Sequence, residues 1–497
     1  MDVNKYLNKS YFDIQRGRHR TVEVIASAAN SVLLRTDEGK VLKLCDDSTS
    51  SRVYNERIEW LQEISKSGKL NDLISLPQTR LTGLRHGEYG YVCDEPCEVT
   101  LNYYIHPSKE IKPFNKWYYD ATGGIEYRLK MGYIIATAIE KIHQLGYCLV
   151  DLCPENTSIT KYNAEERTSP KVKFLGAENI SSYTYHPQIK GSDLYVDPMV
   201  YLNRNGNSVT SDTYSYAVML FELLSTCHPY IGDDCEDEEY RNLIEWVSSG
   251  KLEYIGNDDC DENKNDTFDM TQLFIPKELK ELFYKMFVSG KFSPNERPLI
   301  ADFKKACLRA IQKLIVCSNP ACKREYPYNV NKVCPFCICN KQTENVIVAC
   351  VKRKLCSTEN ILLPYDGKKG FSSLPEIEEN INYMILKPGL NRLPKSFLDP
   401  TLCDDNGASG ILIQCRMDVG RYIIRNRFKK TKFSVNGKVL EPFVKKELAE
   451  KSDISIPLSK EAIIEFPNNL MMDSEEIADL SCEQYGDIIY KWFITIG

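Results

Sequence analysis

The chain has 497 residues, of which 42% are hydrophobic and 27% are charged, and its formal net charge is −6. This composition is typical of a soluble globular chain of about three domains, and the acidic balance argues against a protein that coats nucleic acid. No apolar run reaches about 18 residues and no signal-like segment opens the chain, so we expect a cytoplasmic protein without a membrane partner. Most of the 19 cysteines are then expected to be buried apolar residues rather than disulfides.

The first 20 residues are polar, and we expect them to be an extension ahead of the first domain. Residues 21–46 alternate apolar and polar positions, which predicts three antiparallel strands with Lys43 in the third. A helix that carries Glu56 is predicted over 51–66. A lysine in such a strand usually points to solvent, and the other role open to Lys43 is to pair with a phosphate and with Glu56.

The stretch 146–156, GYCLVDLCPEN, follows a long apolar helix predicted over 125–145. It places Asp151 and Asn156 five residues apart in a loop that contains a proline. This spacing suits a phosphoryl-transfer site, where an Asp orients or deprotonates the attacking hydroxyl and an Asn holds magnesium. A helix that ends in a polar turn explains the stretch equally well, so the flanking sequence has to decide.

Three further motifs follow in order. They are GSDLYVDPM at 191–199, SDTYSYAVMLFELL at 211–224 and NERP at 295–298. With Lys43 in VLKL and with LVDLCPEN, they occur in the order found in protein kinases. Residues 15–315 therefore resemble that family, and the resemblance is nearest to bacterial kinases of the eukaryotic-like serine/threonine type.

The resemblance implies an α+β, bilobal protein-kinase-like fold over residues 1–315, with ATP and magnesium as the family's cofactors. It implies an ion pair between Lys43 and Glu56. It also implies that Asp151 is the catalytic base and that Asn156 binds the metal.

Two departures from the family pattern concern phosphate and metal. The family's phosphate loop, G-x-G-x-x-G-x-V, corresponds to Ile25, Ser27 and Asn30, without a glycine. Glycines let the backbone approach phosphate oxygens, so this loop is expected to hold phosphates poorly. Gly176, after a strand predicted over 171–175, stands where the family has its metal-binding aspartate, and a glycine offers no carboxylate to magnesium.

One route rescues the metal site, because Glu178 is longer than an aspartate by one methylene and lies only two residues away. It would join Asn156 as a metal ligand. The hinge behind the nucleotide pocket is assigned to Asp94, Glu95 and Pro96. A proline there donates no N–H to the adenine, which weakens nucleotide binding by about 1 kcal/mol.

Two smaller losses accompany these. Cys153 stands where the family's catalytic loop usually has a lysine. Met199 replaces the glutamate that normally pairs with Arg297, so we expect this arginine to lack its usual partner.

Two hypotheses follow from these residues. The favoured one is a regulatory or scaffolding pseudokinase that acts by binding other proteins, such as a phosphatase or a signalling partner. The alternative is an active serine/threonine protein kinase that uses Asp151 as base and Glu178 as substitute metal ligand. Retention of Asp151, Lys43 and Glu56 speaks for the alternative.

A second landmark is a cysteine cluster within residues 316–342. Cys317 and Cys322 are followed by Cys334 and Cys337, and Cys339 lies just beyond. Two such pairs separated by eleven residues suit a tetrahedral thiolate site, and the segment resembles a zinc ribbon. We expect a structural zinc ion on the first four cysteines, and a clip or docking role for the module.

Residues 343–497 read as eight or more short strands with turns between them, which predicts an all-β sandwich. KFSVNGKVLEP and KSDISI resemble segments of forkhead-associated domains. The phosphate-binding positions match poorly, because Arg392 and Lys395 only lie near the expected arginine and Ser409 is followed by Leu412 rather than histidine. We therefore expect a protein-interaction domain with no preference for phosphothreonine.

Overall fold

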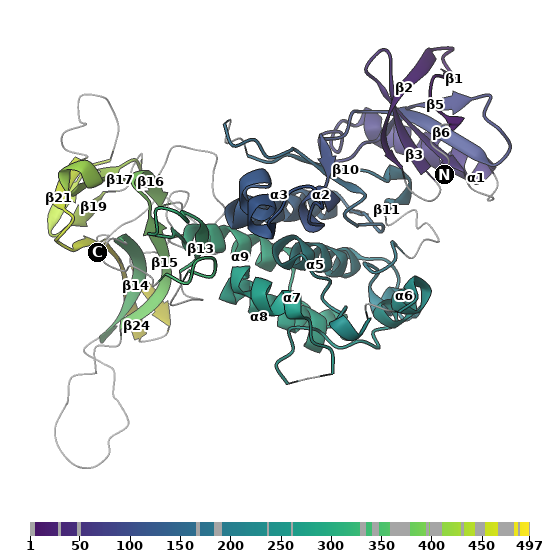
Figure 1. Ribbon diagram of the computed structural model, residues 1–497. Helices are drawn as coiled ribbons and strands as arrows, with labels where there is room; N and C mark the ends of the chain where they lie inside the picture. Colours follow the sequence, from purple (N-terminus) through teal and green to yellow (C-terminus); the bar gives the residue numbers. More distant parts are fainter. Residues whose placement is uncertain are drawn as a thin grey trace. The chain divides into compact units, whose positions relative to one another are not determined.

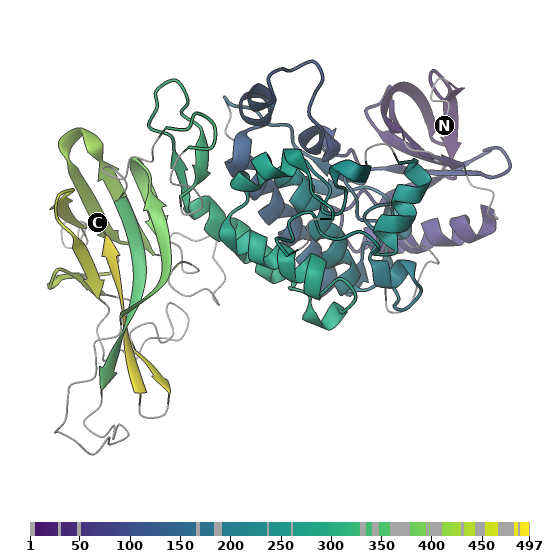
Figure 2. The ribbon, with the colours of Figure 1, turned by 60° about the horizontal axis from the view of Figure 1, so that its bottom comes forward.

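The computed structural model describes most of the chain, and Figures 1 and 2 show it from two directions. The described residues are 5–27, 31–46, 51–165, 169–182, 191–235, 238–259, 262–328, 334–339, 347–357, 378–393, 397, 410–428, 432–442, 453–465, 482–485 and 488–496. The chain divides into two compact units, Met1–Ile311 with Arg324–Val330, and Gln312–Lys323 with Asn331–Gly497. The division into three domains predicted from the sequence stays a prediction.

The first unit begins with an antiparallel sheet that closes into a barrel in the order β1-β2-β3-β4-β6-β5. Its strands are β1 (Ser10–Asp13), β2 (Arg18–Ser27), β3 (Ser31–Thr36), β4 (Val41–Asp46), β5 (Pro77–Thr82) and β6 (Glu88–Cys93). The alternating pattern over 21–46 thus predicted β2, β3 and β4 correctly. Their inward side chains, among them Val32, Leu34, Leu42 and Val92, form the barrel core.

The prediction that the first 20 residues are only an extension is wrong. Phe12 in β1 pairs with Arg18 in β2 and with Thr82 in β5. Strand β1 therefore supplies backbone partners to two strands that would otherwise be sheet edges.

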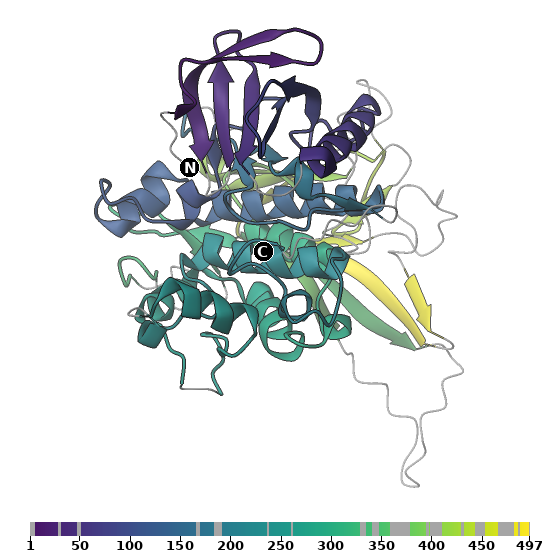
Figure 3. The same ribbon diagram turned by 90° about the vertical axis from the view of Figure 1, so that its right-hand side faces the viewer.

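Helix α1 (Ser51–Lys66) packs against β5 and β6, and Figure 3 shows it beside the strands. Its bounds confirm the predicted helix over 51–66. Ile58, Leu61 and Ile64 are buried at helical spacing.

The rest of the first unit is mainly helical. Its principal helices are α2 (Asn102–Ile105), η2 (Lys116–Ala121), α3 (Gly124–Gln144), α4 (Pro198–Tyr201), α5 (Val209–Ser225), α6 (Tyr240–Ser248), α7 (Asp266–Thr271), α8 (Lys277–Tyr284) and α9 (Ile300–Gln312). Short strands β7 (Val99–Thr100), β8 (Tyr147–Cys148), β9 (Thr157–Ile159), β10 (Val172–Phe174) and β11 (Ser181–Ser182) lie between them. Helix α5 is buried along most of its length and starts at a capping box formed by Ser208 and Ser211.

The second unit contains two antiparallel sheets. Their strands are β14 (Ile347–Ser357), β15 (Glu378–Leu386), β16 (Gly389–Leu393), β17 (Ile411–Arg416), β18 (Arg421–Asn426), β19 (Phe433–Val435), β20 (Lys438–Leu440), β21 (Asp453–Pro457), β22 (Ala462–Glu465), β23 (Cys482–Tyr485) and β24 (Ile488–Ile496). One sheet runs β15-β14-β24-β22-β19-β20, with β23 beside β24, and the other runs β16-β17-β18-β21. Strands β14 and β24 are the long green and yellow arrows that run side by side in Figure 2.

Side chains from both sheets share one hydrophobic core. In β18 the buried Tyr422 and Ile424 alternate with partly or fully exposed residues, as expected of a strand with one buried face. The predicted turn at Asn436-Gly437 joins β19 to β20, and both residues have positive φ, which a two-residue hairpin turn requires.

The fold as described mixes helices and strands, in agreement with the α+β prediction. No helix within the described ranges is both long and apolar enough to span a bilayer.

Candidate functional site

The loop that carries Asp151 is hydrogen-bonded to a buried carboxylate on α5. Asp212 accepts hydrogen bonds from the backbone N–H groups of Leu149 (2.8 Å) and Val150 (3.0 Å). His143, at the end of α3, lies 2.9 Å from the same carboxylate. Val150 has a φ of 65°, an uncommon conformation for a β-branched residue, so this buried anchor fixes a strained backbone.

Asp151 is the centre of a hydrogen-bond cluster. Its Oδ2 accepts from Asn156 Nδ2 at 2.8 Å and from Asn179 Nδ2 at 2.7 Å, and its Oδ1 accepts from the Ser192 hydroxyl. Burial and the nearby Glu178 charge raise the pKa of Asp151, while the hydrogen bonds from Ser192 and Asn179 oppose that rise. The structure thus brings Asp151 and Asn156 together, as the sequence motif predicts.

Lys43 points into the unit and not to solvent. Its ammonium lies 2.5 Å from Glu178 Oε1, and the Tyr91 hydroxyl donates to Glu178 Oε2 at 2.8 Å. Burial alone would lower the pKa of Lys43 and raise that of Glu178. Their mutual attraction reverses both effects, so the pKa of Lys43 is raised and that of Glu178 is lowered. Both groups are therefore charged at neutral pH. Each carboxylate oxygen of Glu178 accepts a hydrogen bond, one from Lys43 and the other from Tyr91.

The expected ion pair between Lys43 and Glu56 is not formed. Glu56 is exposed on α1, and Arg57 is the residue that turns inward. Arg57 donates from Nε to the backbone oxygen of Glu178 at 2.9 Å and from Nη2 to that of Ile180. Neighbouring residues on a helix point about 100° apart, so one step of register exchanges a glutamate for an arginine at this inner face.

Gly176 lies against Asn156. The Leu175 N–H donates to the Asn156 backbone oxygen at 2.7 Å, and a Cβ placed on Gly176 would lie 3.3 Å from Asn156 Nδ2. Gly176 also has a φ of 73°, which suits glycine. A side chain at position 176 would therefore face Asn156, whereas the Glu178 carboxylate is held by Lys43 and Tyr91.

The predicted hinge follows β6, which ends at Cys93. The Asp94 carboxylate accepts from the Gln78 side-chain amide and lies 3.6 Å from the Lys173 ammonium. Of the phosphate-loop positions, Ile25 and Ser27 lie in β2, and Asn30 lies outside the described residues.

Position 199 offers Arg297 no carboxylate, as expected from Met199, but another residue supplies one. Arg297 binds Asp197 through two nitrogen–oxygen pairs, at 2.5 and 2.8 Å, and both side chains are buried. Asp197 caps α4 and lies two residues before Met199, so the carboxylate has moved along the chain rather than been lost.

A cleft of about 1000 Å³ has Lys43, Asp151, Asn156 and Glu178 among its lining residues. Its acidic lining residues are Asp151, Glu155, Glu178, Asp193 and Glu222. Glu222 is buried and accepts from the Tyr195 hydroxyl at 2.8 Å, and burial raises the pKa of Glu222 to about 8. Lys43 is the lysine in this lining, and Glu178 already neutralises it.

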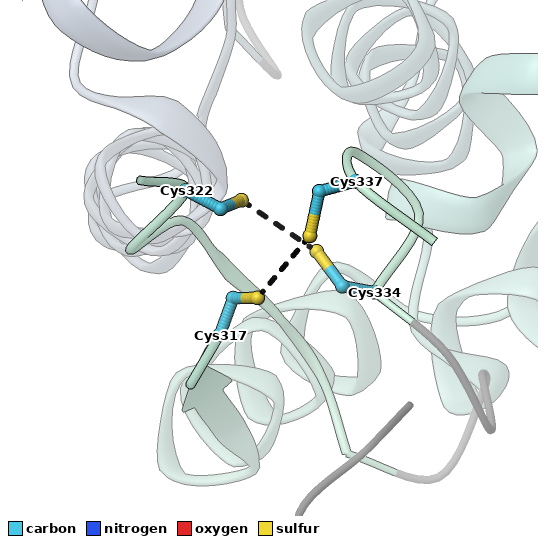
Figure 4. Close-up of side chains that lie close together, drawn as sticks. All are labelled: Cys317, Cys322, Cys334 and Cys337. Carbon is cyan, nitrogen blue, oxygen red and sulfur yellow. Dashed lines mark hydrogen bonds between the residues drawn. The ribbon is translucent and has the colours of Figure 1, made fainter. Parts of the chain in front are cut away.

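The four cysteines of the predicted metal site converge in the second unit (Figure 4). The Sγ atoms of Cys317 and Cys337 are 3.5 Å apart, those of Cys322 and Cys334 are 3.8 Å apart, and all four lie within 4.8 Å of one another. A tetrahedral zinc ion with Zn–S bonds of about 2.3 Å places its sulfurs about 3.8 Å apart. The donor set therefore fits zinc.

The turns that present these cysteines are tight. The Cys322 and Lys323 N–H groups both donate to the Asn319 backbone oxygen, and Lys323 has a φ of 50°. Cys339 is not one of the four converging cysteines, but its backbone oxygen accepts from the Cys334 N–H at 2.8 Å.

Two of the four candidate phosphate-reading positions in the second unit can be placed. Arg392 is exposed on β16 and pairs in register with Leu412 on β17. Lys395 and Ser409 lie outside the described residues.

Sequence reasoning missed two residues that hold Glu178 in place, Arg57 and Tyr91. Arg57 had a signal, because the stripe of Ile58, Leu61 and Ile64 places it on the inner side of α1. Tyr91 had none, because its role depends on the arrival of Glu178 from another part of the chain.

Comparison with known proteins supports the kinase-like part. No family model matches the chain. It is 32% identical to human "Ribosomal protein S6 kinase alpha-6" over 121 residues, which is 24% of this chain and 15% of that protein. It is 27% identical to "Probable serine/threonine-protein kinase gdt2" of Dictyostelium discoideum over 148 residues, which is 30% of this chain and 8% of the relative.

A third relative, "Ribosomal protein S6 kinase 2 alpha" of Xenopus laevis, is 30% identical over 125 residues, which is 25% of this chain and 16% of that protein. The matches thus span less than a fifth of each of these three relatives. They support a kinase-like domain in this chain.

Proposed function

We propose that this chain is a kinase-like regulatory or scaffolding protein in which phosphoryl transfer is absent or strongly impaired, and that it acts by binding other proteins. The observation that carries the proposal is the capture of Lys43 by Glu178 within the cleft. In the family pattern this lysine pairs with a glutamate on the helix that follows it. Here its partner is Glu178, the residue that an active site would need as substitute metal ligand.

The dependence of phosphoryl transfer on bound metal ions also supports the proposal. Phosphoryl transfer depends on positioning and on neutralisation of phosphate charge by metal ions. Gly176 faces Asn156 without a carboxylate, so ATP brought into the cleft would meet an acidic lining and a metal site that lacks its main ligand.

The first test measures nucleotide binding and transfer separately. Thermal-shift series with ATP, with and without magnesium, should give small shifts that depend only slightly on magnesium, because ligand binding to the folded state alone raises its stability. Radiolabelled ATP should give no transfer above the Asp151→Asn level, to generic substrates or to the protein itself. Magnesium-dependent labelling that is lost in Asp151→Asn would overturn the proposal.

The alternative function is an active serine/threonine kinase that uses Glu178 as a metal ligand. It is favoured by the intact cluster around Asp151, in which Asn156, Asn179 and Ser192 are all within hydrogen-bond distance of the carboxylate. Under this alternative, Glu178 would leave Lys43 when the nucleotide and magnesium arrive.

Glu178→Gln separates the two functions, because they predict opposite results. If Glu178 only blocks Lys43, loss of its charge should strengthen nucleotide binding at least several-fold, without transfer activity. If Glu178 binds magnesium, the same change should abolish magnesium-dependent binding and labelling. Glu56→Gln is the matched control, since Glu56 is exposed on α1 and should change neither.

We further propose that Cys317, Cys322, Cys334 and Cys337 hold one structural zinc ion. Zinc would contribute folding free energy on the order of 10 kcal/mol to a segment too small for a core of its own. For residues 343–497 we propose a forkhead-associated-like sandwich that binds protein partners.

A further inference from the structure

The first two strands of the barrel carry a mixed basic and apolar outer face. Phe12, Ile14 and Val22 are 50%, 47% and 46% exposed, and Arg18 and Arg20 are exposed beside them. Phe12 on β1 lies directly opposite Arg18 on β2, and opposite residues of an antiparallel pair point to the same side of the sheet. The other three follow at two-residue steps along the chain, so they share that side. We call these five residues the arginine–phenylalanine face.

The inward side chains of the same strands fix the direction of this face. Asp13, His19 and Thr21 are each at most 6% exposed. His19 lies 2.9 Å from Asp13, and the Thr21 hydroxyl donates to the Tyr6 backbone oxygen at 2.6 Å. A register shift of one residue would turn the arginines inward and expose these polar groups. The arginine–phenylalanine face is therefore a fixed part of the barrel.

The two arginines of the face differ from a neighbouring arginine in their partners. Arg35, on β3, pairs with two glutamates. Among the residues that the structure describes, no ion pair joins Arg18 or Arg20 to an acidic side chain, and Arg18 donates from Nε to the neutral Ser10 hydroxyl at 3.1 Å. The face is thus positive on a chain whose formal net charge is −6, and this charge favours an acidic partner.

The apolar side chains of the face select the kind of partner. Ile14 and Val22 offer no donor to a phosphate, and half-exposed side chains on a strand do not reach the about 5–10 Å into a lipid surface at which interfacial helices lie. Single-stranded nucleic acid stacks on several aromatic rings, but the face has one, because Tyr11 packs against the barrel core. A protein segment that combines Asp or Glu with apolar side chains suits both the arginines and the apolar residues.

We propose that the arginine–phenylalanine face binds an acidic, amphipathic segment of a partner protein. The carboxylates of that segment pair with the two arginines, and its apolar side chains pack on the three apolar residues. Attraction between exposed charges is screened by salt, so binding weakens as salt rises. None of the five residues lines the cleft, so the inference goes beyond the proposed function and holds whether or not the cleft transfers phosphate.

The test measures binding of synthetic peptides to the full chain by fluorescence anisotropy, at low and at physiological salt. In the probe peptide, Asp and Glu alternate with Leu and Phe. One control peptide has Lys in place of the acids, and the other has Ser in place of the apolar residues. The probe should bind at least tenfold more tightly than either control, and more weakly at the higher salt concentration. Equal affinities for the probe and for either control would overturn the proposal.

Variants locate the binding on the surface. Arg18→Glu and Arg20→Glu should each weaken probe binding at least tenfold, and Phe12→Ala should weaken it several-fold. Arg204→Glu and Met270→Ala are the matched controls, because both side chains are exposed outside the barrel, and neither should change the affinity. The thermal midpoint of each variant is measured alongside. If Phe12→Ala lowers that midpoint, the two arginine variants decide.

Three further outcomes would overturn the proposal. The first is unchanged probe binding in both Arg18→Glu and Arg20→Glu. The second is tighter binding of a single-stranded oligonucleotide or of phosphatidylserine vesicles than of the probe, lost in the same two variants. The third is concentration-dependent dimerisation that Arg18→Glu abolishes, which would assign the face to a second copy of the chain.

Discussion

Individual residues show that charge in the kinase-like unit has been rearranged rather than simply lost. Lys43 keeps a carboxylate partner, but that partner is Glu178 instead of a residue on α1. Arg297 likewise keeps one, supplied by Asp197. In both cases a buried charge stays paired, because a lone buried charge costs several kcal/mol.

Asp197→Ala should therefore destabilise the first unit by about 3–5 kcal/mol, since it leaves Arg297 buried without a counter-charge. Denaturant titration followed by tryptophan fluorescence measures the loss. Asp418→Ala breaks the exposed pair with Arg416 and serves as control, with no measurable change expected. Equal stabilities of Asp197→Ala and the parent would contradict this account of the buried pair.

Glu222 gives a prediction on pH. Its pKa in the folded protein is raised from 4.5 to about 8 by burial, so the unfolded state releases this proton first as pH rises. Stability therefore falls between pH about 4.5 and 8 and stops falling from this cause above pH 8.

The glutamine side chain in Glu222→Gln is uncharged at every pH, so this variant should not lose stability from this cause as pH rises. The thermal midpoint of the variant relative to the parent should rise steadily from pH 5 to pH 8. The exposed Glu59→Gln should show no such trend. Parallel curves for Glu222→Gln and the parent would mean that Glu222 is not protonated in the fold.

Among the elements, β1 shows the largest departure from the sequence analysis. Its last residue, Asp13, accepts hydrogen bonds from the backbone N–H groups of Gln15 and Gly17 at 2.8 Å each, and lies 2.9 Å from His19 Nε2. Burial alone would raise the pKa of Asp13, but the hydrogen bonds from His19, Gly17 and Gln15 lower it overall. The Asp13 carboxylate therefore stabilises the turn between β1 and β2 by hydrogen bonds to three of its residues.

Asp13→Asn should weaken the attachment of β1, the strand that closes the barrel. The folded pKa of Asp13 is lowered, so its contribution is present above the unfolded value of 3.8 and is lost as pH falls through the folded value. Amide exchange of residues 10–13 should be faster in the variant at pH 6, and the stability difference from the parent should shrink as pH falls below 3.8. The exposed Asp37→Asn is the control. Unaltered exchange in β1 would refute the role of Asp13.

At the scale of the whole molecule, a kinase-like unit is combined with a cysteine cluster and with a unit of two sheets. The cysteine geometry leads us to expect one zinc ion per chain in freshly purified protein. Cys339→Ser should retain it, whereas Cys337→Ser should lose most of it, as measured by metal analysis. Zinc below about half an equivalent per chain in the parent protein would contradict this prediction.

The two-sheet unit should not discriminate phosphothreonine peptides from threonine peptides. Arg392 is exposed on β16, but the neighbouring position on β17 is Leu412, which offers the phosphate no donor. Calorimetry with matched peptides should give affinities within tenfold, or about 1.4 kcal/mol. A larger preference would show that the phosphate is read from other residues.

The sequence by itself determined what is local. Alternation over 21–46 predicted three strands, the stripe of Ile58, Leu61 and Ile64 predicted α1, and the paired cysteines predicted a cluster whose sulfurs do converge. Each of these depends on a periodicity or on a short spacing, which the sequence contains directly.

The tertiary structure decided which distant groups meet. Lys43 and Glu178 are 135 residues apart in the chain, and no spacing rule predicts that they pair. The one-residue choice between Glu56 and Arg57 on α1, and the closure of the barrel by β1, also depend on how elements dock. Long-range pairing of buried charges and of backbone edges is set by packing, so it becomes visible only once the chain is folded.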